Sequence, residues 1–267
     1  MTRNLFLSLT LLGAIQGPVL AQDEALEQEE ALKKVEMPGY MNRFSNLTEA
    51  KRQAYGQHKL KAEQFFRQKR TFEALDEIYQ AVAIFDEDPG LWNLKGSCHV
   101  EFRSFNKARE AFQRALAIDE KNTGILFNLA EMDFVTKEWK ACIEKMQTLA
   151  KRLEENADGE MDEPTLNLHH LALFKTLLAH LKLGQDAEAR ELAEANWEDW
   201  DDTPFTYYSK AALAYHENDD EAANQWIMSA VRVFGGLNAV ANWQDTLIEF
   251  GYVKSFYGGE EEEIGNE

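Results

Sequence analysis

The chain has 267 residues, and its 47 acidic residues against 28 basic ones give a formal net charge of −19. A chain this acidic is not expected to bind nucleic acid, because neutralising phosphates requires clustered Lys and Arg side chains. The length is sufficient for one extended domain, or two short ones, with a sizeable core.

The N-terminal stretch 1–21 has the composition of a secretory signal peptide. Arg3 precedes a leucine-rich run at residues 5–12, and the small residues Val19 and Ala21 suit cleavage before Gln22. The apolar run is shorter than the roughly 20 residues that a membrane span needs. We therefore expect a periplasmic or secreted protein with no integral membrane segment after cleavage. An uncleaved anchor or a buried first helix is the alternative.

Residues 22–45 are predicted to form a flexible acidic tether. Their first part, residues 22–36, is highly charged and has no aromatic side chain, so it cannot bury enough apolar surface to fold alone. A helix is expected to begin after Asn46 or Thr48, either of which can cap it, with Glu49 in its first turn.

Residues 46–250 are predicted to be all-α, because their apolar residues recur with helical spacing and no useful length alternates as a strand does. Small side chains recur there at a constant step of about 34 residues, and a period of roughly 20–50 residues marks an array of repeats. The three ladders are Ala62, Gly96 and Ala130; Ala74, Ala108 and Cys142; and Ala81 and Ala115. We expect Gly96 and Ala108 to let the two helices of one repeat approach closely, and Ala115 to admit the next repeat.

Two stretches carry a fuller pattern. They are Trp92, Gly96, Ala108, Phe112 and Ala115, and then Tyr207, Ala211, Ala223, Ile227 and Ala230. In these residues the chain resembles the tetratricopeptide repeat (TPR) family, whose 34-residue unit is a helix–turn–helix. The resemblance implies a right-handed superhelical solenoid of about five repeats with flanking helices at both ends. The repeats are 55–88, 89–122, 123–156, 170–203 and 204–237.

The register shifts by about 13 residues between the third and fourth repeats, since the step from Cys142 to Ala189 exceeds the length of one repeat by that amount. A polar loop inserted at about 155–165, or a longer helix, accounts for the shift. The fourth repeat is degenerate, with Leu177 and Asn196 where small residues are expected. A cap helix is predicted at about 238–250 and an acidic disordered tail at 251–267.

The sequence contains no P-loop, no G-x-S-x-G elbow, no H-E-x-x-H and no cysteine pair at zinc spacing. His169 and His170 are adjacent on a predicted helix and point in different directions, so both cannot easily bind one metal ion. The acidic stretch 158–163 does not match an EF-hand loop. We therefore expect no enzymatic activity, no cofactor and no metal.

Two residue pairs have both a structural and a functional interpretation. Cys98 and Cys142, the only cysteines, could form a disulfide in an exported chain, but packing as small apolar residues is favoured. Trp197 and Trp200 could anchor a partner, but packing between the fourth and fifth repeats is favoured because Trp is usually largely buried.

The family resemblance also implies a binding groove, lined by the inward face of each repeat's first helix. Carried over in register, those faces are Lys59, Glu63 and Phe66; Asn93, Ser97 and Val100; Phe127, Glu131 and Phe134; Phe174, Leu178 and Leu181; and Tyr208, Ala212 and Tyr215. Chaperone-binding members of the family clamp a terminal carboxylate with Lys and Asn. Asn93 and Ser97 stand in those places, so no such clamp is expected.

These features predict an exported, non-catalytic scaffold that binds an apolar peptide or an amphipathic helix of a partner protein. The candidate contacts are Asn93, Val100, Phe127, Glu131, Phe134, Phe174, Leu178, Tyr208 and Tyr215. The alternative function is that of an accessory subunit of a bacterial envelope assembly or secretion machine. The groove could instead be filled by a terminal segment of the chain, such as residues 22–50, or by its own rings packing together. The sequence leaves the oligomeric state open.

If the groove is open, replacing Phe127, Phe134 and Tyr208 together by alanine should abolish binding without unfolding the array.

Overall fold

The computed structural model describes residues 38–157, 159–197 and 203–253. The predicted signal peptide, residues 22–37 of the tether, Trp200 and residues 254–267 of the tail lie outside the described residues. The chain divides into two units, Met1–Asn46 and Leu47–Glu267. In the first unit Gly39–Ser45 forms a short helix, α2, so this part of the predicted flexible tether is helical.

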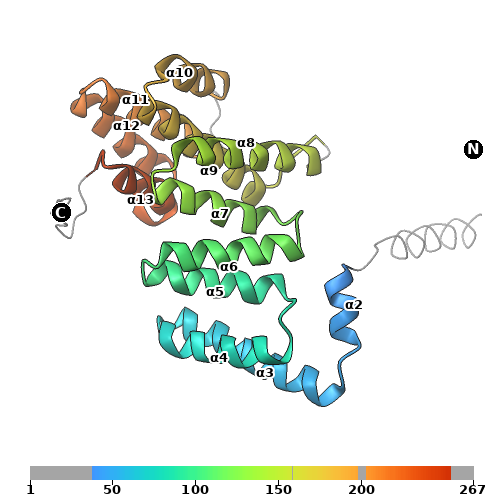
Figure 1. The fold of residues 1–267 in the computed structure, drawn as a ribbon. Coiled ribbons are helices and arrows are strands. Elements are labelled where there is room, and N and C mark those ends of the chain that lie inside the picture. The colour runs from blue at the N-terminus through green and yellow to red at the C-terminus, as the bar shows by residue number, and fades with distance from the viewer. Residues whose placement is uncertain (1–37, 158, 198–202, 254–267) are drawn as a thin grey trace, which may run out of the picture. The chain divides into compact units, whose positions relative to one another are not determined.

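The second unit consists of helices that follow one another in adjacent antiparallel pairs, and its described residues contain no strand (Figure 1). The pairs are α3 (Glu49–Arg67) with α4 (Thr71–Ile84), α5 (Pro89–Glu101) with α6 (Phe105–Ile118), α7 (Thr123–Val135) with α8 (Trp139–Asn156), α9 (Glu163–Lys182) with α10 (Asp186–Ala195), and α11 (Phe205–His216) with α12 (Asp220–Val233). A 3₁₀ helix, η1 (Leu237–Val240), and α13 (Ala241–Phe250) follow. The expected all-α, TPR-like solenoid is confirmed.

Several first helices of the pairs begin at a side-chain cap. Thr48 caps α3, Asn122 caps α7 and Asp162 caps α9, each by accepting a hydrogen bond from the amide three residues on. Asp88 caps α5 through the amides of Gly90 and Leu91. Each cap pairs an amide that the helix itself leaves without a partner.

The turn inside each pair has one repeated geometry. A residue with left-handed backbone recurs at Lys69, Arg103, Lys137, Gly184 and Asn218, with φ between 52° and 69°. The next amide in each turn donates to the carbonyl five residues earlier, as Ser104 does to His99 at 2.9 Å. This is the Schellman arrangement that ends a helix. Its spacing follows the step of the repeats, with the same register shift between Lys137 and Gly184.

The register shift combines longer helices with a longer linker. Helix α8 has 18 residues where α4, α6 and α12 have 14, and α9 has 20 where α5 and α7 have 13. The linker 157–162 has six residues where 85–88 and 119–122 have four. These excesses of four, seven and two residues together account for the whole shift.

The small residues of the ladders lie where neighbouring helices touch. A methyl group at Gly96 would overlap the ring of Phe112 in α6, so this position can hold only glycine without a shift of that ring. Ala108 is fully buried in a cluster with Phe112 and with Leu129 and Met132 of α7. Short side chains at these points set how closely the helices pack.

Cys98 and Cys142 are both buried and unpaired. Burial raises the pKa of each thiol to about 12, so both remain protonated at neutral pH. Protonated, enclosed thiols pack as small apolar side chains.

Replacing Ala108 with Leu should lower the free energy of unfolding by about 1–3 kcal/mol, because the larger side chain overpacks a full contact. Chemical denaturation measures the change. Ala83→Leu, at an exposed position of α4, is the matched control and should alter stability by less than about 0.5 kcal/mol. Equal stability of Ala108→Leu and the parent would show that this packing is wrong.

Replacing Gly184 with Ala should cost about 1 kcal/mol, because its φ of 69° is unfavourable for any residue with a Cβ. Apart from Gly184 itself and its two chain neighbours, no atom lies within 4 Å of the added Cβ, so the cost is conformational. Gly56→Ala, equally free of contacts but inside α3, should instead raise stability by about 0.5–1 kcal/mol. A change of the same sign in the two variants, measured by urea unfolding, would contradict this account.

Candidate functional site

Five of the predicted groove residues come together in one pocket of about 230 Å³ between α3, α5 and α7. They are Phe66, Ser97, Val100, Phe127 and Glu131. The other lining residues are Glu101, Phe112, Asn128, Met132, Val135 and Glu249. We call this set the groove pocket. Its apolar side chains come from consecutive helix pairs, which the stacking of the solenoid brings to one surface.

Polar residues at the edge of the groove pocket are mostly bonded within the protein. Asn128 donates to the side-chain oxygen of Asn93 at 2.8 Å, and Ser97 donates to the Asn93 carbonyl at 3.2 Å. Asn93 therefore supports the pocket from its edge. Lys59 is bound to Asp88 at 2.6 Å, and burial of Asp88 is outweighed by the hydrogen bonds of Lys59 and Tyr55, which lower its pKa. Lys59 thus stabilises the start of α5.

The other half of the predicted groove is closed. Phe134, Phe174, Leu178, Leu181, Tyr208 and Ala212 are buried, and Tyr215 is half-buried; Glu63, on α3, is half-buried and does not line the pocket. Trp243 of α13 packs against Phe174 and Tyr208, at ring-centroid distances of 5.4 and 5.9 Å. These inward residues are covered by the chain itself.

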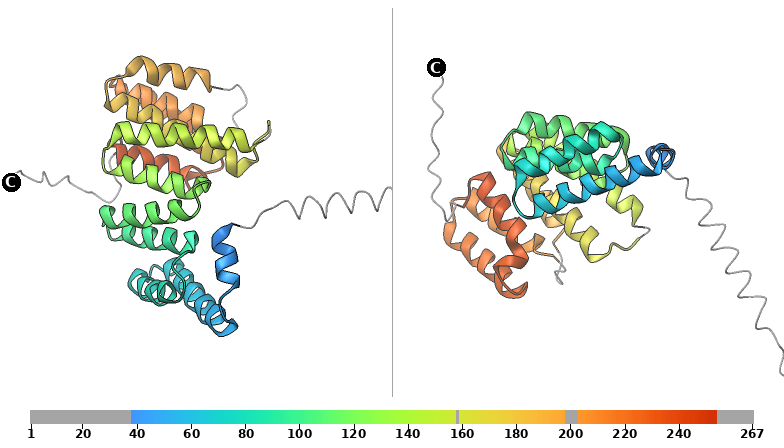
Figure 2. Two further views of the ribbon diagram at one scale, coloured as in Figure 1. Left: turned by 45° about the vertical axis from the view of Figure 1, so that its right-hand side comes forward. Right: turned by 90° about the horizontal axis from the view of Figure 1, so that it is seen from below.

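Helix α13 and the residues after it form that cover. Its apolar stripe is Trp243, Leu247 and Phe250, spaced four and three residues apart, and all three are buried. The Phe250 ring stacks on Phe134 at 6.3 Å, and Tyr252 stacks on Tyr215 at 5.5 Å. In Figure 2 (left) α13, in red, lies against the earlier helices and does not extend the stack. A terminal segment does fill part of the groove, and it is residues 241–253.

This cover corrects one expectation from the sequence. Phe134 and Tyr208 are core residues, so replacing them together with Phe127 would open large cavities and is expected to unfold the array. The predicted cap helix does have an exposed polar side, which includes Asn242 and Asp245 of α13. The spacing of Trp243, Leu247 and Phe250 was the signal for a second, buried side.

A buried lysine joins the cover to the groove pocket. Lys175 of α9 is 2% exposed, and its Nζ lies 2.9 Å from Glu131 Oε1 and 3.7 Å from Glu249 Oε2. The same nitrogen lies 4.3 Å from the centre of the Phe134 ring. Glu131 Oε1 is buried and accepts no hydrogen bond from the described residues, so its compensation is mainly the charge of Lys175. The buried ammonium group of Lys175 is therefore the shared ion-pair partner of two carboxylates.

The surroundings of Glu249 shift the pKa of its carboxyl. Burial raises its pKa above the ordinary value, Lys175 opposes the rise, and the charges of Glu131 and Asp245 add to it. Sequence reasoning missed Lys175. A single charged residue inside the apolar run 171–181 was the available signal.

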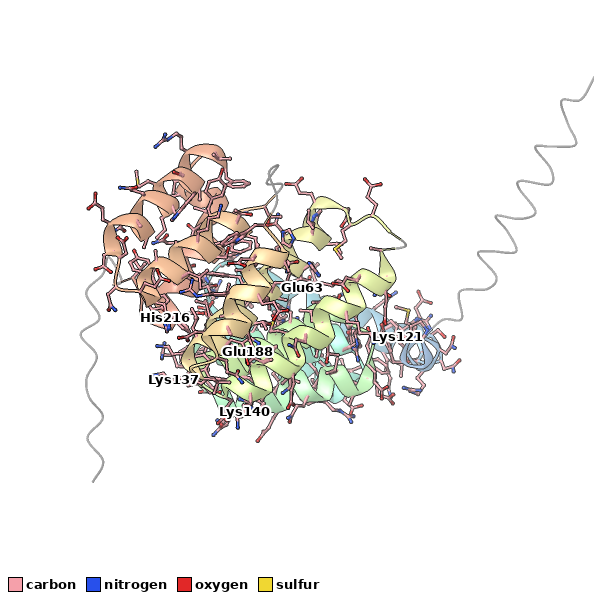
Figure 3. All side chains as sticks on the ribbon, turned by 90° about the horizontal axis from the view of Figure 1, so that it is seen from above. Glu63, Lys121, Lys137, Lys140, Glu188 and His216 are labelled. Carbon is pink, nitrogen blue, oxygen red and sulfur yellow. The ribbon has the colours of Figure 1, made fainter. Side chains whose placement is uncertain are left out.

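Lys69 lies 2.9 Å from Glu101 at the edge of the pocket, and several other basic side chains of the described residues are exposed elsewhere. Lys137 and Lys140, for example, are exposed at the outer edge of the helix stack (Figure 3). The groove pocket has three glutamates and no lysine or arginine among its lining residues. Its wall is therefore apolar with an acidic edge.

The other candidates from the sequence have structural partners. Trp197 donates to Ser209 at 2.8 Å, which places it between α10 and α11. His169 bonds to Glu154 at 2.8 Å, whereas His170 bonds to Thr203 at 2.6 Å. The two imidazoles thus bond to different partners and do not act as one site. Within the described residues, no three His, Cys, Asp or Glu side chains gather as a metal site would require.

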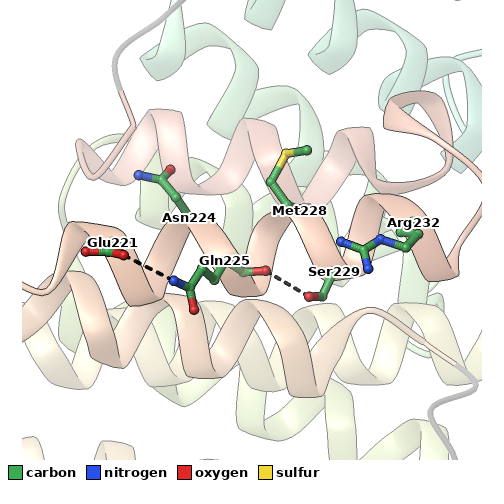
Figure 4. Close-up of a pocket in the computed structure, with 6 residues that line it drawn as sticks. All are labelled: Glu221, Asn224, Gln225, Met228, Ser229 and Arg232. Atoms are coloured by element: carbon green, nitrogen blue, oxygen red, sulfur yellow. Dashed lines mark hydrogen bonds between the residues drawn. The ribbon is translucent and has the colours of Figure 1, made fainter.

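A second depression, of about 510 Å³, lies along α12 and is shown in Figure 4. Its residues are Glu221, Asn224, Gln225, Met228, Ser229 and Arg232. All six come from a single helix, and Gln225 accepts and donates hydrogen bonds along it. Without an opposing wall, this surface does not enclose a ligand.

A helix that spans a bilayer has to be both long and apolar. In the part of the chain that the structure covers, none combines the length and the apolar character of a bilayer span.

Comparison with known proteins gives distant likenesses. No protein-family model matches the chain. Over 167 residues it is 26% identical to the human protein named "Protein O-mannosyl-transferase TMTC3", covering 60% of this chain and 17% of that protein. Among solved structures it is similar to pilF of Pseudomonas aeruginosa, with a TM-score of 0.37 and 14% identity, covering 74% of this chain and 99% of the other. The chain thus spans about a sixth of the curated relative, and its TPR-like fold rests on its own helix pairs and turns.

Proposed function

We propose that the chain is an exported, non-catalytic interaction scaffold that binds an apolar segment of a partner protein in the groove pocket. The observation that carries the proposal is the convergence of Phe66, Val100 and Phe127, from three successive helix pairs, on one pocket. Export rests on the composition of residues 1–21. Binding rests on the described residues alone.

The size of the groove pocket supports a peptide side chain as its occupant. About 230 Å³ is smaller than the roughly 300–1,000 Å³ of sites that enclose whole small molecules. Phe112 and Met132 are buried and form an apolar floor, while Val100 and Phe127 remain half-buried at the rim. A site of this size fits one or two anchoring side chains of a longer segment.

Within the chain itself, an amphipathic helix already packs against the inward face of the solenoid. Helix α13 places Trp243, Leu247 and Phe250 against the inward residues of α7, α9 and α11. The inward faces of this solenoid therefore accept the apolar stripe of a helix. The groove pocket is the continuation of the same surface that α13 leaves open, which supports a helix or extended peptide as the ligand.

The test uses a random 12-residue peptide library displayed on phage and panned on the full chain. Enriched peptides, synthesised with a fluorescent label, should bind the Val100→Ala, Phe127→Ala double variant at least about tenfold more weakly, since their anchor loses its contact area. Phe72→Ala is the control, because this ring is 76% exposed and lies outside the pocket. Thermal unfolding should show that both variants remain folded.

Either of two results would contradict the proposal. One is the absence of enriched peptides after panning. The other is peptides that bind the folded double variant as tightly as they bind the parent.

A further variant tests the charge arrangement behind the pocket wall. Lys175→Met keeps the volume of the side chain but leaves Glu131 and Glu249 without their cation. Loss of one partner of a buried pair costs about 3–5 kcal/mol, and the exposure of Glu249 to solvent should reduce this to about 2–3 kcal/mol at neutral pH.

The cost should shrink as the pH falls. Burial raises the folded-state pKa of Glu249, and loss of Lys175 removes the charge that opposes this rise, so the penalty is present at neutral pH and is lost as Glu249 protonates. Urea unfolding over a pH series measures this. Lys140→Met, at an exposed position, should change stability by less than about 0.5 kcal/mol. A pH-independent cost for Lys175→Met would contradict the arrangement.

A further inference from the structure

We infer that the partner segment carries a basic side chain beside its apolar anchor, and that the carboxylates of Glu131 and Glu249 bind it at the edge of the groove pocket. The inference rests on the proposed binding function and specifies its ligand. The carboxylate clamp of some TPR proteins binds a negatively charged group of the ligand, whereas the site inferred here binds a positively charged one. It also assigns a contact to α13, outside the repeats.

The charges around the pocket are unequal. Of its three glutamates, Glu101 is paired with Lys69 at 2.9 Å. Glu131 and Glu249 share Lys175, which lies beneath them and is inaccessible to a ligand. Two carboxylates against one buried ammonium leave one negative charge uncompensated at the pocket wall. A cation from the ligand is the complementary group.

The two carboxylates are within reach of a ligand. The side chains of Glu131 and Glu249 are 21% and 43% exposed, and both line the pocket. Lys175 of α9, Glu131 of α7 and Asp245 of α13 are the charged groups that act on Glu249, and burial raises its pKa. Partial desolvation strengthens the attraction of such a carboxylate for a cation that replaces its lost water.

The spacing of the wall predicts the spacing in the ligand. Phe127 and Glu131 are four residues apart on α7 and both line the pocket, so their side chains lie about one helical turn apart. A ligand that places an apolar side chain on Phe127 therefore brings a residue three or four positions away, in a helix, to the acidic edge. Lysine and arginine are long enough to reach it while their stems lie on the apolar wall.

Charge also argues against residues 22–36 and 258–267 of this chain as occupants. Residues 22–36 carry six acidic and two basic side chains, and residues 258–267 carry five glutamates and no basic side chain. Like charges would repel them from Glu131 and Glu249. A basic, amphipathic segment of another protein fits the pocket in both respects.

The experiment extends the panning described above to matched peptides. Each enriched sequence is synthesised as the parent, with its basic residue replaced by norleucine, and with it replaced by glutamate. Affinities are measured by fluorescence polarisation for the full chain, for Glu249→Gln and for Glu144→Gln. Glu144 is an exposed carboxylate outside the pocket, so its variant controls for the general loss of one negative charge.

We expect enriched peptides to hold Lys or Arg three or four positions from an apolar residue. Norleucine in place of the basic residue, or Glu249→Gln in the protein, should each weaken binding by about tenfold, and glutamate should weaken it further. Glu144→Gln should change affinity by less than about twofold at physiological salt, because screening limits distant charges. Glu249→Gln should not weaken the norleucine peptide further, since the pair is already lost.

A pH series supplies a second measurement. Affinity for the basic peptide should fall as the pH is lowered, and the fall should begin above the pH at which an ordinary glutamate protonates, because burial raises the pKa of Glu249 and its protonated form no longer attracts a cation. The norleucine peptide should lack this part of the pH dependence.

The outcomes separate this inference from the function on which it rests. Peptides that lose binding with Phe127→Ala, but bind equally well with norleucine or to Glu249→Gln, would overturn the basic-residue inference and leave the scaffold function standing. A lack of any Phe127-dependent peptide would overturn both.

Discussion

Close packing of helices at a fixed repeat step is the constraint on which the rest of the described structure depends. Gly96 leaves no room for a methyl group beside Phe112, and the corresponding Ala62 and Ala130 are fully buried. Because small side chains at these positions let helices approach closely, successive pairs stack with their first helices in a row. Phe66, Val100 and Phe127 then reach one pocket although they belong to three repeats.

The C-terminal helix turns this row into a surface with two different halves. Burial of the apolar stripe of α13 is favourable, and so is burial of the aromatic inward residues of α9 and α11. Their contact through Trp243, Phe174 and Tyr208 provides both at once. It also gives the open half of the groove an end, at which Glu249 lies beside Glu131.

Lys175 links three helices at that end. It extends from α9 to Glu131 of α7 and Glu249 of α13, with the Phe134 ring 4.3 Å away. Burying an ammonium is costly, so a pair of this kind is weak evidence of net stability. Its clearer consequence is geometric, because the lysine holds two carboxylates at the pocket wall while neutralising only one of them.

The sequence by itself determined the features that repeat. The ladders of small residues predicted the repeat step and the register shift before Ala189, and the resemblance to the TPR family implied the helix pairs and the inward positions such as Val100 and Phe127. These features follow from the sequence because helix packing within and between neighbouring repeats is local. Only the tertiary structure decided which inward residues stay accessible and which charges meet at Lys175. Both depend on where α13 docks. An amphipathic stripe shows that one face of a helix must be buried, but it does not specify the surface that buries it.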